Sequence, residues 1–217
     1  MFRFHPQHAK VKEMIENNKI GNLIAFNGSF GFPTFPDEDI RYMKNLGGGF
    51  LNDCGCYPIC ASRMIFDAEP IGVSCNLSVD PKTGVDVRGT SYMTFDGEKT
   101  ASITYGTGNY YQAQYEVWGS DGIISLERAY SIPPDLKAKM KIQFGTQHDW
   151  DSRKNETLEV NTNDHFLEMI NAFCLEIQGR KKIAYDIEKD LIDQARVMEA
   201  HRISSEEKRF VPLDEIV

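Results

Sequence analysis

The sequence predicts an α+β fold in which helices cover one face of an antiparallel or mixed β-sheet. Three observations lead to this prediction. Apolar residues recur at helical spacing near both ends of the chain, whereas they alternate with polar residues over 69–126 in the centre. In addition, strands and helices do not alternate as the β-α-β units that a doubly wound nucleotide-binding domain requires. The length of 217 residues suits one large domain or at most two small ones.

The first third of the chain is expected to form a helix, a strand, a loop and a second helix. Apolar residues at i, i+3 and i+4 predict a short amphipathic helix over 8–18, and residues 22–32, rich in Leu, Ile and Phe, predict a strand. Prolines and a triple glycine mark 33–49 as a loop. A second helix is expected over about 52–66, although a glycine and a proline inside it weaken this prediction. Asp53 lies near its start, where a carboxylate can cap free amide groups.

The central part predicts consecutive strands joined by tight turns. The alternation of apolar and polar residues begins near Glu69, and Asp96-Gly97 is a strong hairpin turn. Two further strands are expected within 137–160, around a loop near 145–153. The other expected strands cover about 71–77, 87–95, 101–105, 111–118 and 123–126.

The C-terminal part predicts two helices. Apolar residues at helical spacing from His165 onward mark the first helix, which is expected to end near Gly179. A second pattern of the same kind runs from Ile187 to Glu199, and Asp186 is expected to open that helix. Helices at both ends and strands between them complete the α+β arrangement.

Composition argues against several classes of protein. The chain has 24 Lys and Arg against 32 Asp and Glu, a net charge of −8, and no block of five basic residues, which argues against bulk nucleic-acid binding. No run of about 18 apolar residues occurs, so no membrane-spanning helix is expected, and the N-terminus has no apolar signal-peptide core. Five cysteines, an odd number, favour a reducing cytoplasm over a secreted disulfide scaffold.

The sequence contains no motif for a nucleotide or a catalytic metal. Dinucleotide binding requires Gly-x-Gly-x-x-Gly between a strand and a helix, and Gly47-Gly48-Gly49 lacks that spacing. Walker-type loops, Gly-x-Ser-x-Gly elbows and His-Glu-x-x-His zinc motifs are absent as well. We therefore expect no phosphate cradle and no metal site in this chain.

The segment after the triple glycine carries the main candidate for chemistry. If it is helical from Asn52, then Asp53 and Tyr57 lie at i and i+4 on one face. A carboxylate beside a phenol can orient it or exchange protons with it. A tyrosine acts as general acid or base when a neighbour, usually a cation, lowers its pKa from about 10. The alternative is that Asp53 caps the helix and Tyr57 packs with its hydroxyl exposed.

Three cysteines lie in the same segment. The spacing of Cys54, Cys56 and Cys60 is not a usual zinc spacing, and no histidine is near them in the sequence. We expect them to be buried thiols that behave as small apolar side chains.

Several cations flank this region. Arg3, Arg41 and Arg63 can hold an anionic or polyhydroxyl ligand, and we predict Arg3 and Arg41 as substrate contacts. The alternative is that each is a solvated surface side chain. His165 opens a helix and can reach a site, although a surface or capping role is the simpler explanation.

Aromatic side chains accumulate in the central strands. With helices on one face only, the other face must be polar or hidden, and an aromatic-rich face is typical of a subunit interface. The alternative is a solvated face with isolated aromatic residues. The residues concerned are Tyr105, Tyr110, Tyr111, Tyr115 and Trp118.

Taken together, these segments resemble the C-terminal domain of the Gfo/Idh/MocA (glucose–fructose oxidoreductase / inositol dehydrogenase) family. The resemblance covers nearly the whole chain in order, and the glycine-rich Asp-x-Gly-x-Tyr segment is its most specific part. A tyrosine four residues after the aspartate, where many members carry histidine, is similar to the dihydrodiol dehydrogenase branch. The matching segments are residues 3–6, 19–23, 47–58, 69–70, 84–86 and 119–124.

The resemblance implies an open, mainly antiparallel sheet over 1–217, whose free face serves a homodimer or homotetramer. It implies that Tyr57 transfers a proton at a sugar or diol hydroxyl, that Asp53 supports it, and that the complete enzyme uses NAD(P). In the family, a lysine of an N-terminal Rossmann domain lies beside this pair, and neither that lysine motif nor the glycine-rich loop occurs in this chain. The chain therefore resembles half of an oxidoreductase. We expect that this chain alone binds no cofactor and that the Rossmann domain lies outside it. The alternative is a non-catalytic dimerisation or sugar-binding module.

Overall fold

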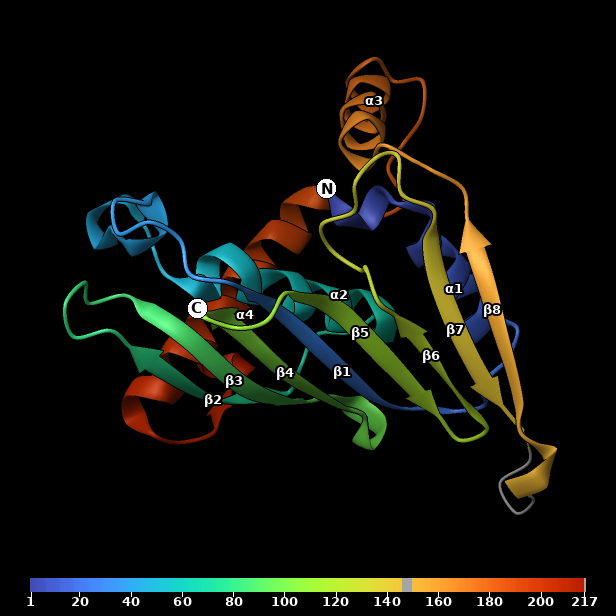
Figure 1. The fold of residues 1–217 in the computed structure, drawn as a ribbon, viewed down its shortest axis with the longest axis horizontal. Coiled ribbons are helices and arrows are strands. Elements are labelled where there is room, and N and C mark those ends of the chain that lie inside the picture. The colour runs from blue at the N-terminus through green and yellow to red at the C-terminus, as the bar shows by residue number, and fades with distance from the viewer. Residues whose placement is uncertain (146–149, 217) are drawn as a thin grey trace.

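The computed structural model describes residues 1–145 and 150–216, which form one sheet with four α-helices (Figure 1). The helices are α1 (Pro6–Glu16), α2 (Cys56–Phe66), α3 (His165–Ile177) and α4 (Ile187–Glu207). The first five strands are β1 (Leu23–Phe32), β2 (Gly72–Val79), β3 (Asp86–Thr94), β4 (Thr100–Thr107) and β5 (Gln112–Gly119). The last four are β6 (Gly122–Leu126), β7 (Ala138–Phe144), β8 (Lys154–Val160) and β9 (Val211–Pro212).

The nine strands form one open sheet in the order β8-β7-β6-β5-β1-β4-β3-β2-β9. Among the described strands, β1 and β4 make the one parallel pair, and every other neighbouring pair is antiparallel. The predicted α+β class, with an open and mainly antiparallel sheet, is confirmed. The predicted order of helices and strands also holds, and β9 is an additional strand that sequence periodicity did not indicate.

Helices α1, α2 and α4 lie against one face of the sheet, whereas α3 projects beyond its edge (Figure 1). Glycines allow the start of α2 to approach the sheet closely. A Cβ on Gly55 would lie 2.9 Å from the ring of Tyr105 in β4, and a Cβ on Gly28 in β1 would lie 2.8 Å from Pro58. The glycine that weakened the helix prediction is therefore required by packing between helix and sheet.

Local sequence explains where the helices begin. Helix α1 begins at Pro6, two residues before the predicted start, because proline is pre-set for the first helical position and the ring of His5 accepts a hydrogen bond from the Gln7 amide. Asp186 caps α4 by accepting from the Lys189 amide, as predicted. Helix α4 then continues to Glu207, and Ser204 and Ser205 accept hydrogen bonds from amides of β2 that β9 does not reach.

The prediction that aromatic residues gather on the open face of the sheet is wrong for most of them. Tyr105 and Tyr115 are 1% and 0% exposed and belong to the core under the helices. Tyr111 packs on Phe32, and Tyr110 lies in the loop between β4 and β5. Because side chains alternate along a strand, Trp118 faces the side opposite Tyr115 and is the one predicted aromatic residue on the open face.

Candidate active site

The predicted second helix begins as a π-helical turn, Leu51–Gly55, which continues into α2. Asp53 lies inside this π-turn, and Tyr57 lies in the first turn of α2. Among the described contacts, no hydrogen bond joins Asp53 to Tyr57. The two residues lie near each other, but the predicted direct pair is not formed.

Asp53 pairs with Arg41 instead. The Asp53 carboxylate lies 2.8 Å from Nε of Arg41, and Asp39 accepts from the backbone and the guanidinium of the same arginine at 3.0 and 3.1 Å. The ring of Phe35 lies 4.4 Å from the guanidinium carbon. The two carboxylates, Asp53 first, raise the pKa of Arg41 further above its usual value. Arg41 is therefore a cation held by two carboxylates, which limits its capacity to bind an anionic substrate.

Asp86, which the sequence analysis did not single out, caps this turn. The Leu51 amide donates to the carboxylate of Asp86 at 2.6 Å, so Asp53 does not cap the turn and its predicted alternative role is wrong. A Cβ on Gly49 would lie 2.3 Å from the Asp86 carboxylate, which explains the glycine at this position. Burial raises the pKa of Asp86.

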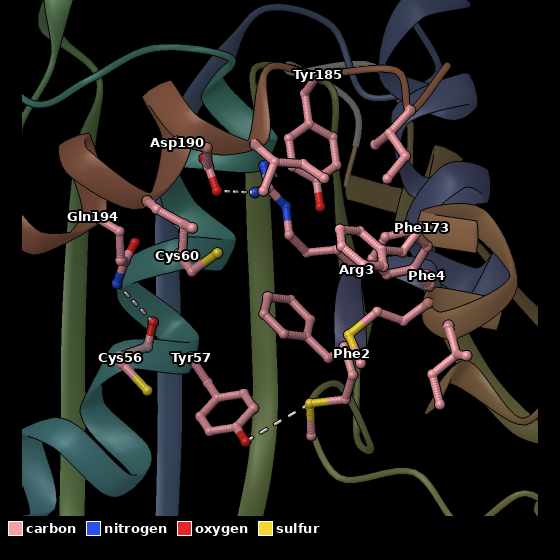
Figure 2. Close-up of a pocket in the computed structure, with 16 residues that line it drawn as sticks. Phe2, Arg3, Phe4, Cys56, Tyr57, Cys60, Phe173, Tyr185, Asp190 and Gln194 are labelled. Atoms are coloured by element: carbon pink, nitrogen blue, oxygen red, sulfur yellow. Dashed lines mark hydrogen bonds and ion pairs between the residues drawn. The ribbon is translucent and has the colours of Figure 1, made fainter. Parts of the chain in front are cut away.

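Tyr57 lies at the start of α2 and is surrounded by aromatic rings. Its ring meets Phe30 edge-on at 5.2 Å between centroids and lies 5.8 Å from Phe2 and 6.0 Å from Tyr130. Its hydroxyl points toward the sulfur of Met1 at 3.8 Å (Figure 2). Burial, and then the negative charge of neighbouring groups, raises the pKa of Tyr57 to about 12. The hydroxyl is therefore protonated at neutral pH in this chain, and it is placed to donate a proton.

Tyr57 lines a cavity of about 460 Å³ between α2, α3, α4 and the N-terminal segment. Figure 2 shows the side chains of Phe2, Arg3 and Phe173 on the side opposite α2. The walls are mainly apolar, and their polar groups include the Gln194 amide, which donates to a carbonyl of α2 at 3.1 Å. Of the four predicted site residues, this cavity includes Tyr57 and Arg3, whereas Asp53 and Arg41 lie outside its lining.

Arg3 is part of an ion-pair network that joins the N-terminal segment to α4. Its guanidinium binds the carboxylate of Asp190 and lies 4.1 Å above the ring of Tyr185. Asp190 also lies 3.4 Å from buried Arg63, which pairs with Glu69. The predicted substrate contact Arg3 thus faces the cavity with its charge already paired. Arg63 is not a surface cation, because it is buried and links α2 to α4 through Asp190.

The three cysteines of the segment are held as protonated thiols. Cys54 is buried and donates to the carbonyl of Phe50, while burial raises the pKa of Cys56 to about 12 and also raises that of Cys60. Within 1–145 and 150–216, no three His, Cys, Asp or Glu side chains gather as a metal site. In the same part of the chain, no helix is long and apolar enough to cross a membrane.

His165 is neither exposed nor a cap, contrary to the simpler explanation of its position. It is 1% exposed, its ring lies 6.1 Å from that of His5, and Asp164 caps α3 in its place. It is the one residue of α3 that is fully buried in the described chain. His165 therefore anchors a helix whose apolar side chains are otherwise half exposed.

A row of aromatic rings beside Tyr57 was missed from the sequence. It contains Phe30, Phe32 and Phe35, with centroids 4.6 and 5.8 Å apart, and Tyr111, which lies 5.8 Å from Phe32. We call these four residues the aromatic row. The phenylalanines at alternate positions of β1 were a signal for one face of that strand, but the sequence did not indicate that Tyr111 joins them.

A dinucleotide does not fit the described glycine-rich turn. The Leu51 amide at its end, the kind of group that would cradle a phosphate, is already bound by Asp86. A carboxylate at that position also repels an anionic ligand.

Comparison with known proteins supplies a family and its relatives. A model described as the GFO/IDH/MocA C-terminal domain matches residues 8–125. A dTDP-3,4-didehydro-2,6-dideoxy-α-D-glucose 3-reductase of Saccharopolyspora spinosa is 30% identical over 92% of this chain and 60% of that protein. The D-xylose 1-dehydrogenase (NADP(+)) 2 of Haloferax volcanii is 26% identical over 99% of this chain and 63% of its own length.

Solved structures are similar over the same part. A 3-ketoreductase from Actinomadura kijaniata, in complex with NADP and TDP-benzene, superposes with a TM-score of 0.86 at 30% identity and covers 94% of this chain and 60% of that one. The chain thus spans about three fifths of the length of these relatives. All three relatives are oxidoreductases, of which the first two act on sugars and the last two are associated with NADP.

Proposed function

Because the chain belongs to the GFO/IDH/MocA oxidoreductase family, we propose that it is the substrate-binding and proton-transfer part of an NAD(P)-dependent enzyme acting on a sugar, a sugar derivative or a related polyol. The observation that carries the proposal is the placement of Tyr57. Its protonated hydroxyl lies at a cavity, among aromatic rings, and close to the paired Asp53 and Arg41. Aromatic rings commonly pack against the apolar faces of small polar ligands, while a few polar groups orient them.

Tyr57 is proposed as the acid and base of the reaction. In the direction of reduction, its O–H donates a proton to the carbonyl oxygen of the substrate, and in the direction of oxidation its phenolate takes the proton of the hydroxyl. With a pKa of about 12 in this chain, the donor state is the stable one. The base role requires an added cation near the phenol, because Arg41 is already held by Asp39 and Asp53.

Asp53 and Arg41 are proposed to act as one unit beside Tyr57. Arg41 orients the Asp53 carboxylate, and the carboxylate in turn accepts a hydrogen bond from a substrate hydroxyl. Arg3 keeps its predicted role as a substrate contact, which it can exercise through the edge of the guanidinium that faces the cavity. Each of these roles is tested by substitution in an active assembly.

A cofactor-binding Rossmann domain, in the same protein or in another chain, is proposed as the partner that completes the enzyme. Apolar side chains of α3 that are at least half exposed offer a surface for it next to the N-terminal segment (Figure 1). These side chains are Phe166, Leu167, Ile170, Phe173 and Ile177.

The proposal also includes a homo-oligomer through the open sheet face. It further includes a cytoplasmic location, in keeping with five free cysteines.

A second candidate function is a sugar-binding or dimerisation module without catalysis. The observation in its favour is Asp86, which occupies the glycine-rich turn and leaves no dinucleotide cradle there. The two candidates differ in whether a cofactor domain restores hydride transfer.

The experiment is a titration of this chain with NADPH and with neutral sugars, followed by tryptophan and nicotinamide fluorescence, with and without the Rossmann domain of a relative. Sugar binding by the chain and NADPH-dependent turnover only in the mixture support the enzyme part. Sugar binding without turnover in any mixture supports the module. Micromolar NADPH binding by the chain alone would overturn the assignment of cofactor binding to another domain.

A further inference from the structure

Gln194 in α4 binds the peptide group that leads into Tyr57. Its side-chain amide donates to the carbonyl of Cys56 at 3.1 Å, and Figure 2 shows this bond between α4 and the start of α2. The carbonyl of Cys56 and the amide of Tyr57 belong to the same planar peptide group. The bond from Gln194 therefore holds the backbone from which the Tyr57 side chain reaches the cavity.

The other end of the Gln194 side chain is held by Arg63. Oε1 of Gln194 accepts from Nη1 of Arg63 at 2.6 Å. The side chain of Arg63 is 3% exposed, and its Nε and Nη2 donate to the two carboxylate oxygens of Glu69 at 2.5 and 2.7 Å, which fixes the plane of the guanidinium. Because a guanidinium only donates and the carbonyl of Cys56 only accepts, the amide of Gln194 fits between them in one orientation.

The first turn of α2 depends on support from outside the helix. It follows the π-turn directly, and Pro58, the third residue of α2, has no amide hydrogen, so the helical bond from Pro58 to the carbonyl of Cys54 cannot form. The hydroxyl of Tyr57 adds little support, because its partner is the sulfur of Met1, a weak acceptor. The bond from Gln194 is thus a strong directional contact at the residue that precedes Tyr57.

Gln194 lines the cavity, but its polar groups are already used. Its oxygen binds Arg63 and its NH₂ group binds the carbonyl of Cys56. A substrate that took either group would remove a partner from the buried guanidinium or from the carbonyl, and the loss of such a partner costs free energy. The geometry therefore favours a role in placing Tyr57 over a direct contact with the substrate.

We propose that Gln194 is a positioning residue, which holds Tyr57 so that its hydroxyl meets the reacting oxygen of the substrate. The effect on turnover rests on the proposed function, whereas the placement of Tyr57 is measured without any reaction. Misplacement of a reacting group by about 1 Å lowers a rate by about 10²-fold. Loss of the bond from Gln194 to Cys56 is therefore expected to act on the rate of reaction rather than on substrate affinity.

Gln194→Glu tests the bond to Cys56 by itself. The carboxylate has nearly the same shape and still accepts from Arg63, which keeps it ionised, but it has no hydrogen to donate to the Cys56 carbonyl. Gln194→Met has a similar length and removes both bonds. The matched control is Gln143→Glu, on the open face in β7, where the exposed amide donates to Asn155 at 3.0 Å.

The first measurement is ¹⁹F NMR of the full chain alone, labelled with 3-fluorotyrosine. Of the nine tyrosine signals, that of Tyr57 is the one missing in Tyr57→Phe. The rings of Phe30 and Phe2 lie 5.2 and 5.8 Å from that of Tyr57, so a change in its placement shifts the signal. We expect Gln194→Glu and Gln194→Met to shift or broaden this signal, and Gln143→Glu to leave it in place.

The second measurement is turnover in the assembly with a cofactor domain. Gln194→Glu should lower kcat by about 10-fold to 10²-fold and leave the substrate KM within about twofold, since the bond that it loses acts on the placement of the proton donor. The urea midpoint of Gln194→Glu should stay close to that of Gln143→Glu, because the contact with Arg63 is kept. A purely structural role of Gln194 would instead lower the midpoint and leave kcat unchanged.

The proposal is overturned if the Tyr57 signal stays in place in Gln194→Glu, or if it moves only in Gln194→Met, because the contact with Arg63 alone would then matter. A raised KM at unchanged kcat would also overturn it and make Gln194 a substrate contact. A failure of the proposed function is separate, because it appears as unchanged turnover in Tyr57→Phe, and the ¹⁹F signal still reports whether Gln194 places Tyr57. Turnover lost in Tyr57→Phe but kept in Gln194→Glu would reject this inference alone.

Discussion

The carboxylate of Asp53 lies 2.8 Å from Nε of Arg41 and makes no hydrogen bond with Tyr57, four residues further along the described chain. Asp53 lies in the π-turn Leu51–Gly55, and Tyr57 lies in the first turn of α2. Arg41 therefore orients the Asp53 carboxylate, whereas the Tyr57 hydroxyl lies at the cavity and donates to the sulfur of Met1.

Tyr57→Phe removes the proposed proton donor while keeping the ring and its contact with Phe30. In an assembly with a cofactor domain, we expect turnover to fall by about 10²-fold or more, the usual contribution of a positioned acid or base. Cofactor affinity should stay unchanged. Tyr92→Phe, on the open face, is the control and should keep full turnover. Equal turnover of Tyr57→Phe and the unsubstituted protein would reject the role.

Arg41→Gln leaves Asp39 and Asp53 without their shared cation. Because these side chains are partly exposed, we expect a stability loss of no more than about 1 kcal/mol in urea unfolding. We expect a much larger relative loss of turnover, with partial recovery in Arg41→Lys. A stability loss of several kcal/mol with normal turnover would make Arg41 a structural residue.

Gly55→Ala places a Cβ 2.9 Å from the ring of Tyr105, at the closest approach of α2 to the sheet. Overpacking of this kind costs about 1–3 kcal/mol, so the urea midpoint should fall. Ser102→Ala, on the open face of β4, is the control and should change it little. An unchanged midpoint for Gly55→Ala would show that the helix can move away from the sheet.

Acid should destabilise the fold through its buried histidines. Burial lowers the pKa of His201 from 6.5 to about 4 and that of His8 to about 3. A depressed pKa in the folded state means that the unfolded chain takes up protons first, so stability is present above about pH 6.5 and is lost as the pH falls toward 4. The free energy of unfolding, measured from pH 7 to 4, should decline less steeply in His201→Gln. An identical slope would reject this contribution.

The open sheet face should mediate self-association. We expect light scattering to report a dimer or tetramer at tens of micromolar. Trp118→Ser should lower the average mass, because Trp118 is a large apolar side chain of the open face and is 44% exposed. Tyr110→Ser, in the loop between β4 and β5, is the control. A monomer for the unsubstituted chain would reject the interface.

Local patterns in the sequence were sufficient to predict most elements of the fold. Alternation along 69–126 predicted the central strands, and capping by Asp186 predicted the start of α4. The same reasoning placed Tyr57 at a helix start beside Asp53. Two features had no local signal: the parallel pairing of β1 with β4, and strand β9, whose two residues pair with β2.

The aromatic residues show why the candidate site was predicted only in part. Period two assigns Tyr115 and Trp118 to opposite faces, but the sequence does not say which face the helices cover. The prediction of an aromatic open face therefore failed for Tyr105 and Tyr115, which the helices bury. The sequence shows that these strands carry aromatic residues, but it does not show on which face of the sheet each one lies.

By itself, the sequence determined the fold class, the family and the tyrosine at the start of α2, because periodicity, caps and short motifs are properties of neighbouring residues. The tertiary structure decided which charges meet. Asp53 pairs with Arg41, Asp86 caps the turn at Leu51, and Arg128 stacks on Tyr111. Each of these contacts joins residues that lie 12 to 35 positions apart. The packing of strands and loops determines which residues make these contacts, and no local pattern in the sequence predicts them.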